Sequence, residues 1–157
     1  MPATTPSASL KVQPICVSDL DAVMQIETQV FSAPWSRESY LELIPQAAIK
    51  MWTMKNAEQL VGYMLYQCWA EEMELHTIAV DPQSHGQGIG KLLMEKLFAE
   101  AQANSVIQIY LQVRVSNERA IQLYERFNFK KVGMRKRYYQ DNFEDAFVMR
   151  ATLAKPN

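Results

Sequence analysis

The segment His85-Gly-Gln-Gly-Ile-Gly90 constrains the fold of this chain more than any other, because it opens directly into a helical pattern. Glycines allow a tight turn and a close approach of the backbone to a ligand, and the first turn of a helix presents free amide groups to an anion. On its own, such a turn is more often a plain strand-to-helix connection than a ligand site. It is not a P-loop, since no Gly-Lys-Ser/Thr follows, and it lacks the G-x-G-x-x-G spacing of a dinucleotide-binding loop.

Apolar residues on either side of this turn predict helices that interrupt a sheet. The helix after the turn has one apolar face, formed by Ile89, Leu92, Leu93, Leu97 and Ala101. Strands are expected over residues 11–16, 51–54, 61–69, 74–80, 106–115, 129–138 and 143–153, the second to fourth of them as an antiparallel meander. Further helices are expected over 18–30, capped by Ser18, from Ser36 to Pro45, and after the cap Asn117. The pattern therefore predicts a mixed α/β protein.

The composition favours one domain with no nucleic-acid partner. The chain has 157 residues, of which 48% are apolar, so it can bury roughly two-thirds of its unfolded surface in one core. Residues 1–10 have almost nothing apolar to bury and are expected to be a flexible leader, with a single domain over 11–157. A formal charge of −1 lacks the basic excess of a nucleic-acid-binding protein.

The sequence also argues against a membrane location and a metal site. No apolar run reaches the roughly 18 residues of a membrane span, and no secretory signal begins the chain, so the cytoplasm is the expected location. Cys16 and Cys68 are the only cysteines, and they have no CxxC spacing. We therefore expect neither a disulfide framework nor a bound metal.

The segments next to the glycine turn resemble the acetyl-CoA-binding core of one enzyme family. Ile78-Ala-Val-Asp-Pro82 precedes the turn, and Leu111-Gln-Val-Arg-Val-Ser-Asn117 and Ala120-Ile-Gln-Leu-Tyr124-Glu-Arg-Phe-Asn-Phe129 follow it. In this order they resemble the GCN5-related N-acetyltransferases, the GNAT superfamily. The resemblance implies a mostly antiparallel central sheet of about seven strands with helices on both faces. It also implies a central pair of parallel strands that splay apart around the coenzyme.

Three more segments narrow the resemblance to one branch of that family. They are Phe31-Ser-Ala-Pro-Trp-Ser36, Arg135-Lys-Arg-Tyr-Tyr139 and Glu144-Asp-Ala-Phe-Val-Met149. All are similar to the RimI branch, bacterial enzymes that acetylate the N-terminal alanine of a small-subunit ribosomal protein. The resemblance covers roughly Val12 to Leu153. It implies an N-alpha-acetyltransferase with acetyl-CoA as cosubstrate and no metal, in which the amine of a ribosomal protein attacks the thioester directly in a ternary complex.

The resemblance assigns site residues by matching position. Ile78–Val80 would offer backbone groups to the pantetheine arm and polarise the thioester carbonyl. The glycine turn would hold the pyrophosphate, and Asn117 would contact coenzyme A. Tyr124 would protonate the leaving thiolate, since a phenol of pKa near 10 is a proton donor at working pH. The residues expected at the coenzyme are Ile78, Ala79, Val80, His85, Gly86, Gln87, Gly88, Ile89, Gly90, Lys91, Asn117 and Tyr124.

The general base is missing from its usual place. Members of the RimI branch usually carry Glu in the motif LEVRxSN, where this chain has Gln112, and an amide cannot accept a proton near neutral pH. Three explanations stay open: Gln112 orients a water that shuttles the proton, Glu72, Glu74 or His76 on the neighbouring strand is the base, or the chain binds acetyl-CoA without efficient transfer. We favour a working enzyme, because an α-amine of pKa near 8 is roughly 10% neutral at pH 7 and asks little of a base.

Two further positions differ from the family pattern. His85 stands where the family often has Arg or Gln, so it is either a phosphate contact or a solvated loop histidine. Asn128 stands where Gly is common after the helix. Asn tolerates the left-handed conformation that ends a helix, so this change is expected to be neutral.

The acceptor side of the site is assigned to Trp35, Tyr139 and Glu27. Trp35 is expected in the substrate pocket, with a core or lid position as the alternative. Tyr139 is expected to face the cleft, because strand alternation would turn Tyr138 to the opposite face. Glu27 is on the first helix beside the Trp35 loop, although a solvated helix face is the commoner place for such a residue.

Two functions of other kinds stay open. One is acetylation of lysine or a small polyamine, for which Glu71, Glu72 and Glu74 would supply an acidic acceptor pocket. The other is a non-catalytic coenzyme A sensor. Glu144 and Asp145 either meet a substrate amine or close a strand turn. The sequence leaves open which protein is the acceptor, which group is the base, the oligomeric state and the role of the leader.

Overall fold

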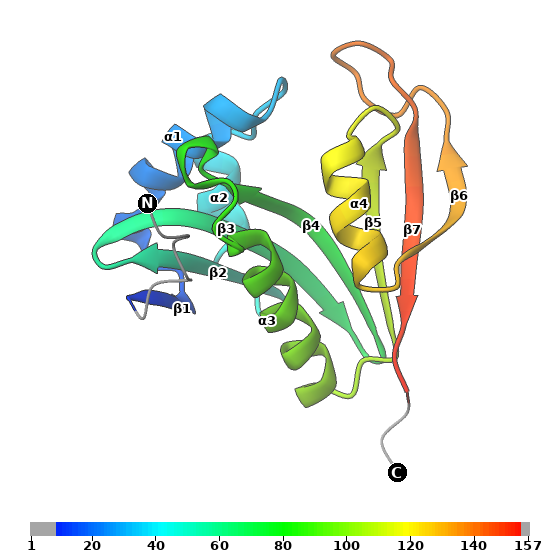
Figure 1. Ribbon diagram of the computed structural model, residues 1–157, viewed down its shortest axis with the longest axis horizontal. Helices are drawn as coiled ribbons and strands as arrows, with labels where there is room; N and C mark the ends of the chain where they lie inside the picture. The colour runs from blue at the N-terminus through cyan, green and yellow to red at the C-terminus, as the bar shows by residue number, and fades with distance from the viewer. Residues whose placement is uncertain (1–8, 155–157) are drawn as a thin grey trace. The chain divides into compact units, whose positions relative to one another are not determined.

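The computed structural model describes residues 9–154 (Figure 1). Its strands are β1 (Leu10–Pro14), β2 (Ile49–Asn56), β3 (Gln59–Trp69), β4 (Glu72–Val80), β5 (Gln108–Arg114), β6 (Lys130–Arg135) and β7 (Ala146–Thr152). Its helices are α1 (Leu20–Val30), α2 (Arg37–Leu43), α3 (Ile89–Ala103) and α4 (Glu118–Arg126), with 3-10 turns at Val17–Asp19 and Pro82–Ser84. The expected mixed α/β order is confirmed. Most of the expected leader lies outside the described residues, and Leu10 already belongs to β1.

The strands form one seven-stranded sheet in the order β1-β2-β3-β4-β5-β7-β6. β1 pairs with β2, and β7 pairs with both β5 and β6, in antiparallel fashion. β4 and β5 are parallel, in a ladder that joins Glu72–Leu75 to Gln108–Leu111, and both strands continue beyond it. The mostly antiparallel sheet with a parallel pair is therefore confirmed, while the splay of that pair stays a prediction.

The contacts divide the chain into two compact units. The first comprises the described residues up to Tyr66 together with Thr77–Lys96, and the second comprises Gln67–His76 and the described residues from Leu97 onward. Each unit has its own buried residues on its own part of the sheet. The expectation of a single domain over 11–157 stays a prediction.

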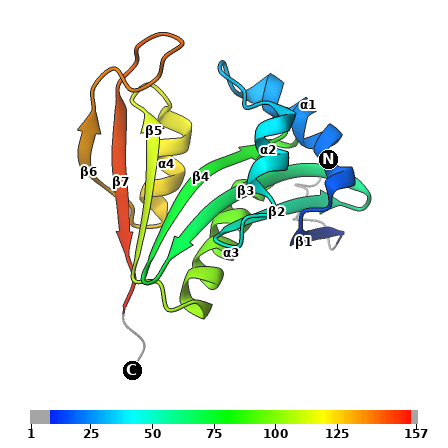
Figure 2. The same ribbon diagram turned by 180° about the vertical axis from the view of Figure 1, so that it is seen from behind.

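In the first unit, helices cover both faces of the strands, as Figure 1 and, from behind, Figure 2 show. α1 and α2 lie on one face, where their apolar residues pack on β2 and β3. This cluster comprises Leu20, Val23, Ile26, Tyr40, Ile49, Met51, Leu60, Tyr63, Leu65 and Ala79. The start of α3 lies on the other face at Gly62, where an added Cβ would be 3.0 Å from Ile89 Cγ2 and from the Ala79 carbonyl oxygen. The absence of a side chain at Gly62 therefore lets α3 approach β3 closely.

In the second unit, β5 separates an apolar sheet face from a polar one. α4 covers one face of β5 and β7 (Figure 1), and the residues of β5 alternate between buried and half-buried. The buried ones are Ile109, Leu111 and Val113, and those on the other face are Gln108, Tyr110, Gln112 and Arg114. A row of polar side chains therefore lies on the face of β5 away from α4.

The start of α1 differs from the expectation. The residue at the N-cap position of the helix is Asp19 and not Ser18, which lies in the preceding 3-10 turn, and the Asp19 side chain makes no capping hydrogen bond to α1. Asp19 accepts a hydrogen bond from the Cys16 amide at 2.9 Å and pairs with Lys55 Nζ at 2.8 Å. A carboxylate makes stronger, charge-assisted hydrogen bonds than a hydroxyl, so Asp19 sets the entry of the chain into the helix.

The strand expected over 129–138 ends early, at Arg135. Arg137 has a positive φ of 52°, and its amide donates to Asp145 at 2.8 Å, so the chain leaves the sheet there. Tyr138 and Tyr139 consequently lie in the loop 136–145 between β6 and β7. The expectation that they occupy opposite faces of a strand is wrong.

Candidate active site

The glycine turn after β4 is shaped by backbone conformation rather than by packing. Gly86 and Gly88 have positive φ values of 85° and 77°, which residues with a side chain rarely adopt. In the described part of the chain, no heavy atom lies within 4 Å of a Cβ added at either position. The turn is therefore open on its outer side, which suits the close approach of a ligand.

α3 follows this turn and presents the backbone donors of a helix N-terminus. The Leu92 amide closes the first helical turn onto the Gly88 carbonyl at 3.0 Å. The amides of Ile89–Lys91 therefore precede the ladder of hydrogen bonds within the helix. Free amides at the positive end of a helix of 15 residues attract an anion. His85 and Lys91 are exposed beside them.

The end of β4 lies directly before the glycine turn. Ala79 is buried, and Ile78 and Val80 are half-buried. The Asp81 amide donates to the Val61 carbonyl at 2.8 Å, which ties the end of β4 to β3. Because the chain then turns at once into residues 82–91, the structure brings the predicted pantetheine and pyrophosphate residues together in the first unit.

In the second unit, α4 holds the two other residues predicted at the coenzyme. Asn117 caps the helix, and its Oδ1 accepts a hydrogen bond from the Ala120 amide at 3.2 Å. Tyr124 follows two helical turns later, so it lies on the same side of α4, and it is only 6% exposed. Burial, and then the neighbouring Tyr139 phenol, raise the pKa of Tyr124. Its hydroxyl therefore keeps its proton throughout the neutral range.

The candidates for the base lie on the polar face of the second unit. Glu74 is opposite Tyr110 in the parallel ladder. His76 Nδ1 lies 3.4 Å from Glu74 Oε2, and His76 Nε2 lies 3.1 Å from Gln67 Oε1. Gln112 shares the face of Tyr110, one period further along β5. The structure therefore brings Glu74 and His76 together as a pair, next in the sheet to the strand that carries Gln112.

Glu27 is buried, with 1% of its surface exposed, so its expected place on a solvated helix face is wrong. Its Oε1 accepts hydrogen bonds from the hydroxyls of Tyr40 at 2.7 Å and Tyr63 at 2.5 Å. Its Oε2 accepts one from the Trp35 amide at 2.8 Å. Burial is the largest cause that raises the pKa of both phenols, so both stay protonated as donors. The carboxylate of Glu27 thereby fixes the backbone at Trp35.

Trp35 itself lies between the core and the solvent. Its side chain is half-buried and packs against the first core cluster. The ring centroids of Trp35 and Tyr40 are 5.3 Å apart, in a tilted arrangement. The loop that carries the Trp35 ring is thus anchored at both its backbone and its side chain, and the role of the ring at the substrate stays a prediction.

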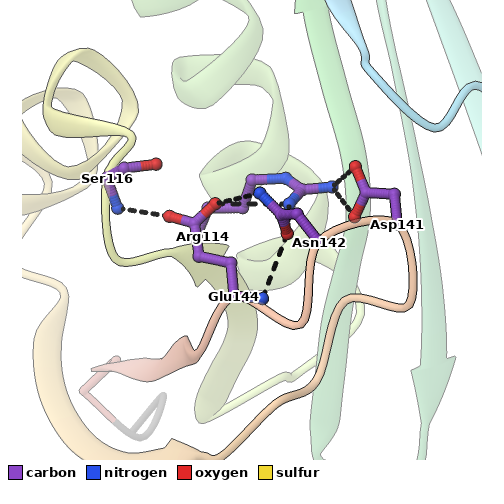
Figure 3. Close-up of polar contacts among 5 residues, drawn as sticks. All are labelled: Arg114, Ser116, Asp141, Asn142 and Glu144. Carbon is purple, nitrogen blue, oxygen red and sulfur yellow. Dashed lines mark hydrogen bonds and ion pairs between the residues drawn. The ribbon is translucent and has the colours of Figure 1, made fainter.

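Glu144 and Asp145 bind groups of their own loop and its neighbours. Glu144 Oε2 accepts a hydrogen bond from the Ser116 amide at 2.9 Å (Figure 3). Asp145 Oδ2 lies 3.2 Å from Lys136 Nζ, and Oδ1 accepts from the Arg137 amide. These hydrogen bonds lower the pKa of both carboxyl groups. Asp145 therefore closes the connection between β6 and β7, whereas Glu144 binds Ser116 and Arg114, and contact of either carboxylate with a substrate amine stays a prediction.

Sequence reasoning assigned Glu27 to the acceptor side but missed its burial, and it missed other residues that shape the site. A signal for the burial existed, because Glu27 follows Val23 by four residues and Leu20 by seven and so falls on the apolar stripe of α1. The partners Tyr40 and Tyr63 had no such signal. Neither did Arg114, because its ion-pair partners stand 27 and 30 residues later in the chain.

No metal centre accompanies these residues within the described range 9–154. Within that range, no group of three or more His, Cys, Asp or Glu side chains is arranged to hold a metal ion. Cys16 and Cys68 are not joined in a disulfide, and Cys16 is exposed. Over the same range, none of the helices has the length and apolarity needed to cross a bilayer.

Comparisons with known proteins find relatives along most of the chain. The model of the acetyltransferase (GNAT) family matches residues 20–129. The ribosomal protein bS18-alanine N-acetyltransferase of Escherichia coli (strain K12) is 33% identical over 134 residues, which are 84% of this chain and 90% of that protein. The N-alpha-acetyltransferase RimI of Mycobacterium tuberculosis (strain H37Rv) is 32% identical over 146 residues, which are 89% of this chain and 90% of that protein.

A solved structure matches the same architecture. It is the crystal structure of the ribosomal-protein-S18-alanine N-acetyltransferase from Escherichia coli, with a TM-score of 0.87 and 29% sequence identity. The match covers 94% of this chain and 96% of that chain. The likeness therefore extends over nearly the full length of both proteins.

Proposed function

This chain belongs to the acetyltransferase (GNAT) family, and we propose that it transfers the acetyl group of acetyl-CoA to the α-amine of an N-terminal alanine on a ribosomal protein. The observation that carries this proposal is the likeness, over 84% to 89% of the chain, to enzymes named for N-terminal acetylation. The proposed acceptor is made in the cytoplasm, so we place the enzyme there.

The proposed coenzyme site fits the residues of the glycine turn. The positive φ values of Gly86 and Gly88, the open space beside them and the amides of Ile89–Lys91 suit a diphosphate, which needs backbone donors at close range. His85, Gln87 and Lys91 would flank it, while the backbone of Ile78–Val80 would hold the pantetheine arm. Acetyl-CoA would supply the acetyl group there as an activated thioester.

Tyr124 is the proposed general acid. Burial keeps the phenol protonated, so a proton is present for the sulfur as its bond to the acetyl carbon breaks. Asn117 fixes the start of the helix that carries Tyr124, and its amide nitrogen is left to contact coenzyme A.

The proposed general base is the Glu74–His76 pair. Carboxylate and imidazole both accept protons, which the amide of Gln112 cannot do. The pair lies on the strand beside Gln112, and a water bound to Gln112 would connect it to the amine. An α-amine is roughly 10% neutral at pH 7, so a base at one water's distance is sufficient.

The test is acetylation of synthetic acceptors, followed by mass spectrometry at saturating acetyl-CoA. We expect acetylation of an alanine-starting peptide taken from a ribosomal protein, and at most trace acetylation of an N-terminally blocked lysine peptide or of spermidine. Gln112→Glu, which restores the usual carboxylate, is expected to raise the rate. Absence of turnover by the parent protein would defeat the proposal, and preferred acetylation of lysine or spermidine would assign a different acceptor.

A further inference from the structure

Arg114 stands at the end of β5 and binds three residues of the loop 136–145 (Figure 3). Its Nη2 donates to both carboxylate oxygens of Asp141 at 3.0 Å. Its Nη1 donates to Asn142 Oδ1 at 3.1 Å and to Glu144 Oε1 at 3.3 Å. A planar guanidinium with donors in fixed directions can serve several acceptors at once, which an ammonium group does less well. One side chain of the sheet thereby holds the segment 141–144.

The same guanidinium lies against the ring of Tyr139. Its central carbon is 3.9 Å from the ring centroid, a stacking distance for a cation on an aromatic face. The Tyr139 amide donates to the Glu144 carbonyl at 3.2 Å, and the Phe143 amide donates to the Tyr139 carbonyl at 2.7 Å. Tyr139 therefore has its ring on Arg114 and its backbone on the segment that Arg114 holds.

Two features make the loop 136–145 depend on Arg114. The backbone of the loop is strained, and the other ion pair of the loop, between Lys136 and Asp145, is exposed to water. Arg137 and Phe143 have positive φ values of 52° and 59°, which are unfavourable for residues with a side chain. The pair of Lys136 and Asp145 stabilises little, because the Lys136 side chain is 76% exposed. The side chain of Arg114 is 21% exposed, so its ion pairs are better shielded from water.

Glu144 extends this cluster to α4. It accepts a hydrogen bond from the Ser116 amide at 2.9 Å, and Ser116 directly precedes the helix cap Asn117. The helix carries Tyr124, whose pKa is raised in part by Tyr139. The cluster therefore connects the loop to the start of the helix that bears the proposed acid.

We infer that Arg114 is a positioning residue for acceptor binding: it holds the loop 136–145 in the conformation that presents Tyr139 to the acceptor peptide. The inference rests on the proposed function and goes beyond it by naming the group that shapes the acceptor side of the site. Arg114 acts through Tyr139 and the loop, and not on the reacting atoms.

The first test is a kinetic comparison of variants. Arg114→Gln removes the cation, so the carboxylates of Asp141 and Glu144 repel each other and the loop opens. The KM for the alanine-starting peptide is expected to rise about tenfold, while kcat and the KM for acetyl-CoA change less than about twofold. Arg114→Lys keeps the charge without the planar donors and is expected to give an intermediate KM. Lys136→Gln, which removes the exposed pair of the same loop, is the matched control and leaves all three constants unchanged.

The second test measures how accessible the loop 136–145 is to a protease and needs no acetylation assay. Limited proteolysis by chymotrypsin, followed by mass spectrometry, reports cleavage after Tyr138, Tyr139 and Phe143. Arg114→Gln is expected to be cut there about tenfold faster than the parent protein or Lys136→Gln, at an unchanged melting temperature.

The outcomes separate this inference from the proposed function. A parent protein that acetylates no amine defeats the proposed function, whereas the proteolysis still decides whether Arg114 holds the loop. An unchanged acceptor KM in Arg114→Gln overturns the inference, and so does cleavage at the parental rate. A joint fall of kcat and melting temperature also overturns it, because it would mark a purely structural residue.

Discussion

Tyr124 shows how one buried residue can stay a proton donor. Its pKa is raised because burial disfavours the charged phenolate. We predict that Tyr124→Phe keeps the fold and lowers kcat about 100-fold, the size of effect expected for a lost general acid. Steady-state acetylation of the alanine-starting peptide measures it. Tyr66→Phe is the matched control, since it removes another buried phenol, whose oxygen accepts from Trp52 at 3.0 Å. Equal kcat for Tyr124→Phe and the parent protein would exclude Tyr124 from the proton transfer.

Glu27 is the residue whose loss should weaken the first unit most sharply. Its carboxylate accepts from Tyr40, Tyr63 and the Trp35 amide. Glu27→Gln keeps one oxygen for the two phenols but turns the other into a donor that faces the Trp35 amide, and leaving that amide without its acceptor costs about 1–3 kcal/mol of unfolding free energy. Urea unfolding at pH 7 measures this loss. Glu42→Gln, at an exposed position of α2, should change the unfolding free energy by less than about 0.5 kcal/mol. Similar losses in both variants would contradict the prediction.

Single residues differ in how far the sequence predicts them. Asn117 was predicted as a helix cap, and it is one, because a cap acts on amides only three residues away. The interpretation of Glu27 as a solvated residue was wrong, because its hydrogen-bond partners Tyr40 and Tyr63 come from other segments of the chain and the spacing within α1 does not reveal them. The contacts of Arg114 depend on two segments meeting in space, which no local spacing encodes.

Secondary-structure elements were predicted well where periodicity alone determines them. The helix that starts at Ile89 and the alternation along β5 both follow from the spacing of apolar residues. The strand that ends at Arg135 was predicted to be too long, because the residue types that follow Arg135 are as common in strands as those before it. The turn there depends on the hydrogen bond between the Arg137 amide and Asp145, which is a tertiary contact. The coenzyme and acceptor roles of the site residues remain predictions from the family resemblance.

The glycine turn before α3 offers a test at the level of an element. Gly88 has a φ of 77° with open space around its missing side chain, so Gly88→Ala suffers from its backbone conformation alone. We predict a loss of about 1–2 kcal/mol in unfolding free energy and weaker binding of coenzyme A, measured by urea unfolding and by calorimetry. Gly133→Ala is the matched control, since its added Cβ would be 3.9 Å from Val148, an ordinary contact. Tight coenzyme binding by Gly88→Ala would argue against a ligand at this turn.

At the scale of the whole molecule, buried phenols should limit stability at alkaline pH. The pKa values of Tyr40, Tyr63 and Tyr124 are all raised, chiefly by burial. The unfolded chain ionises its phenols near pH 10, whereas the folded chain keeps them protonated. Their contribution is therefore complete below about pH 10 and is lost as the pH rises above it. We predict that the urea midpoint is level from about pH 7 to 9 and falls steeply beyond about pH 10. The fall should be shallower in Tyr63→Phe, and an equally steep fall there would refute this origin.

The order of the strands has a consequence for how the protein is made. β7 lies between β5 and β6, and it is the last strand of the described chain to leave the ribosome. Until Ala146–Thr152 has emerged, β5 and β6 lack the neighbour that joins them, and the nascent polypeptide exposes the edges of both. Assembly of this half of the sheet therefore has to wait until β7 has been made. Premature termination before residue 146 should yield an aggregation-prone fragment rather than a smaller folded protein.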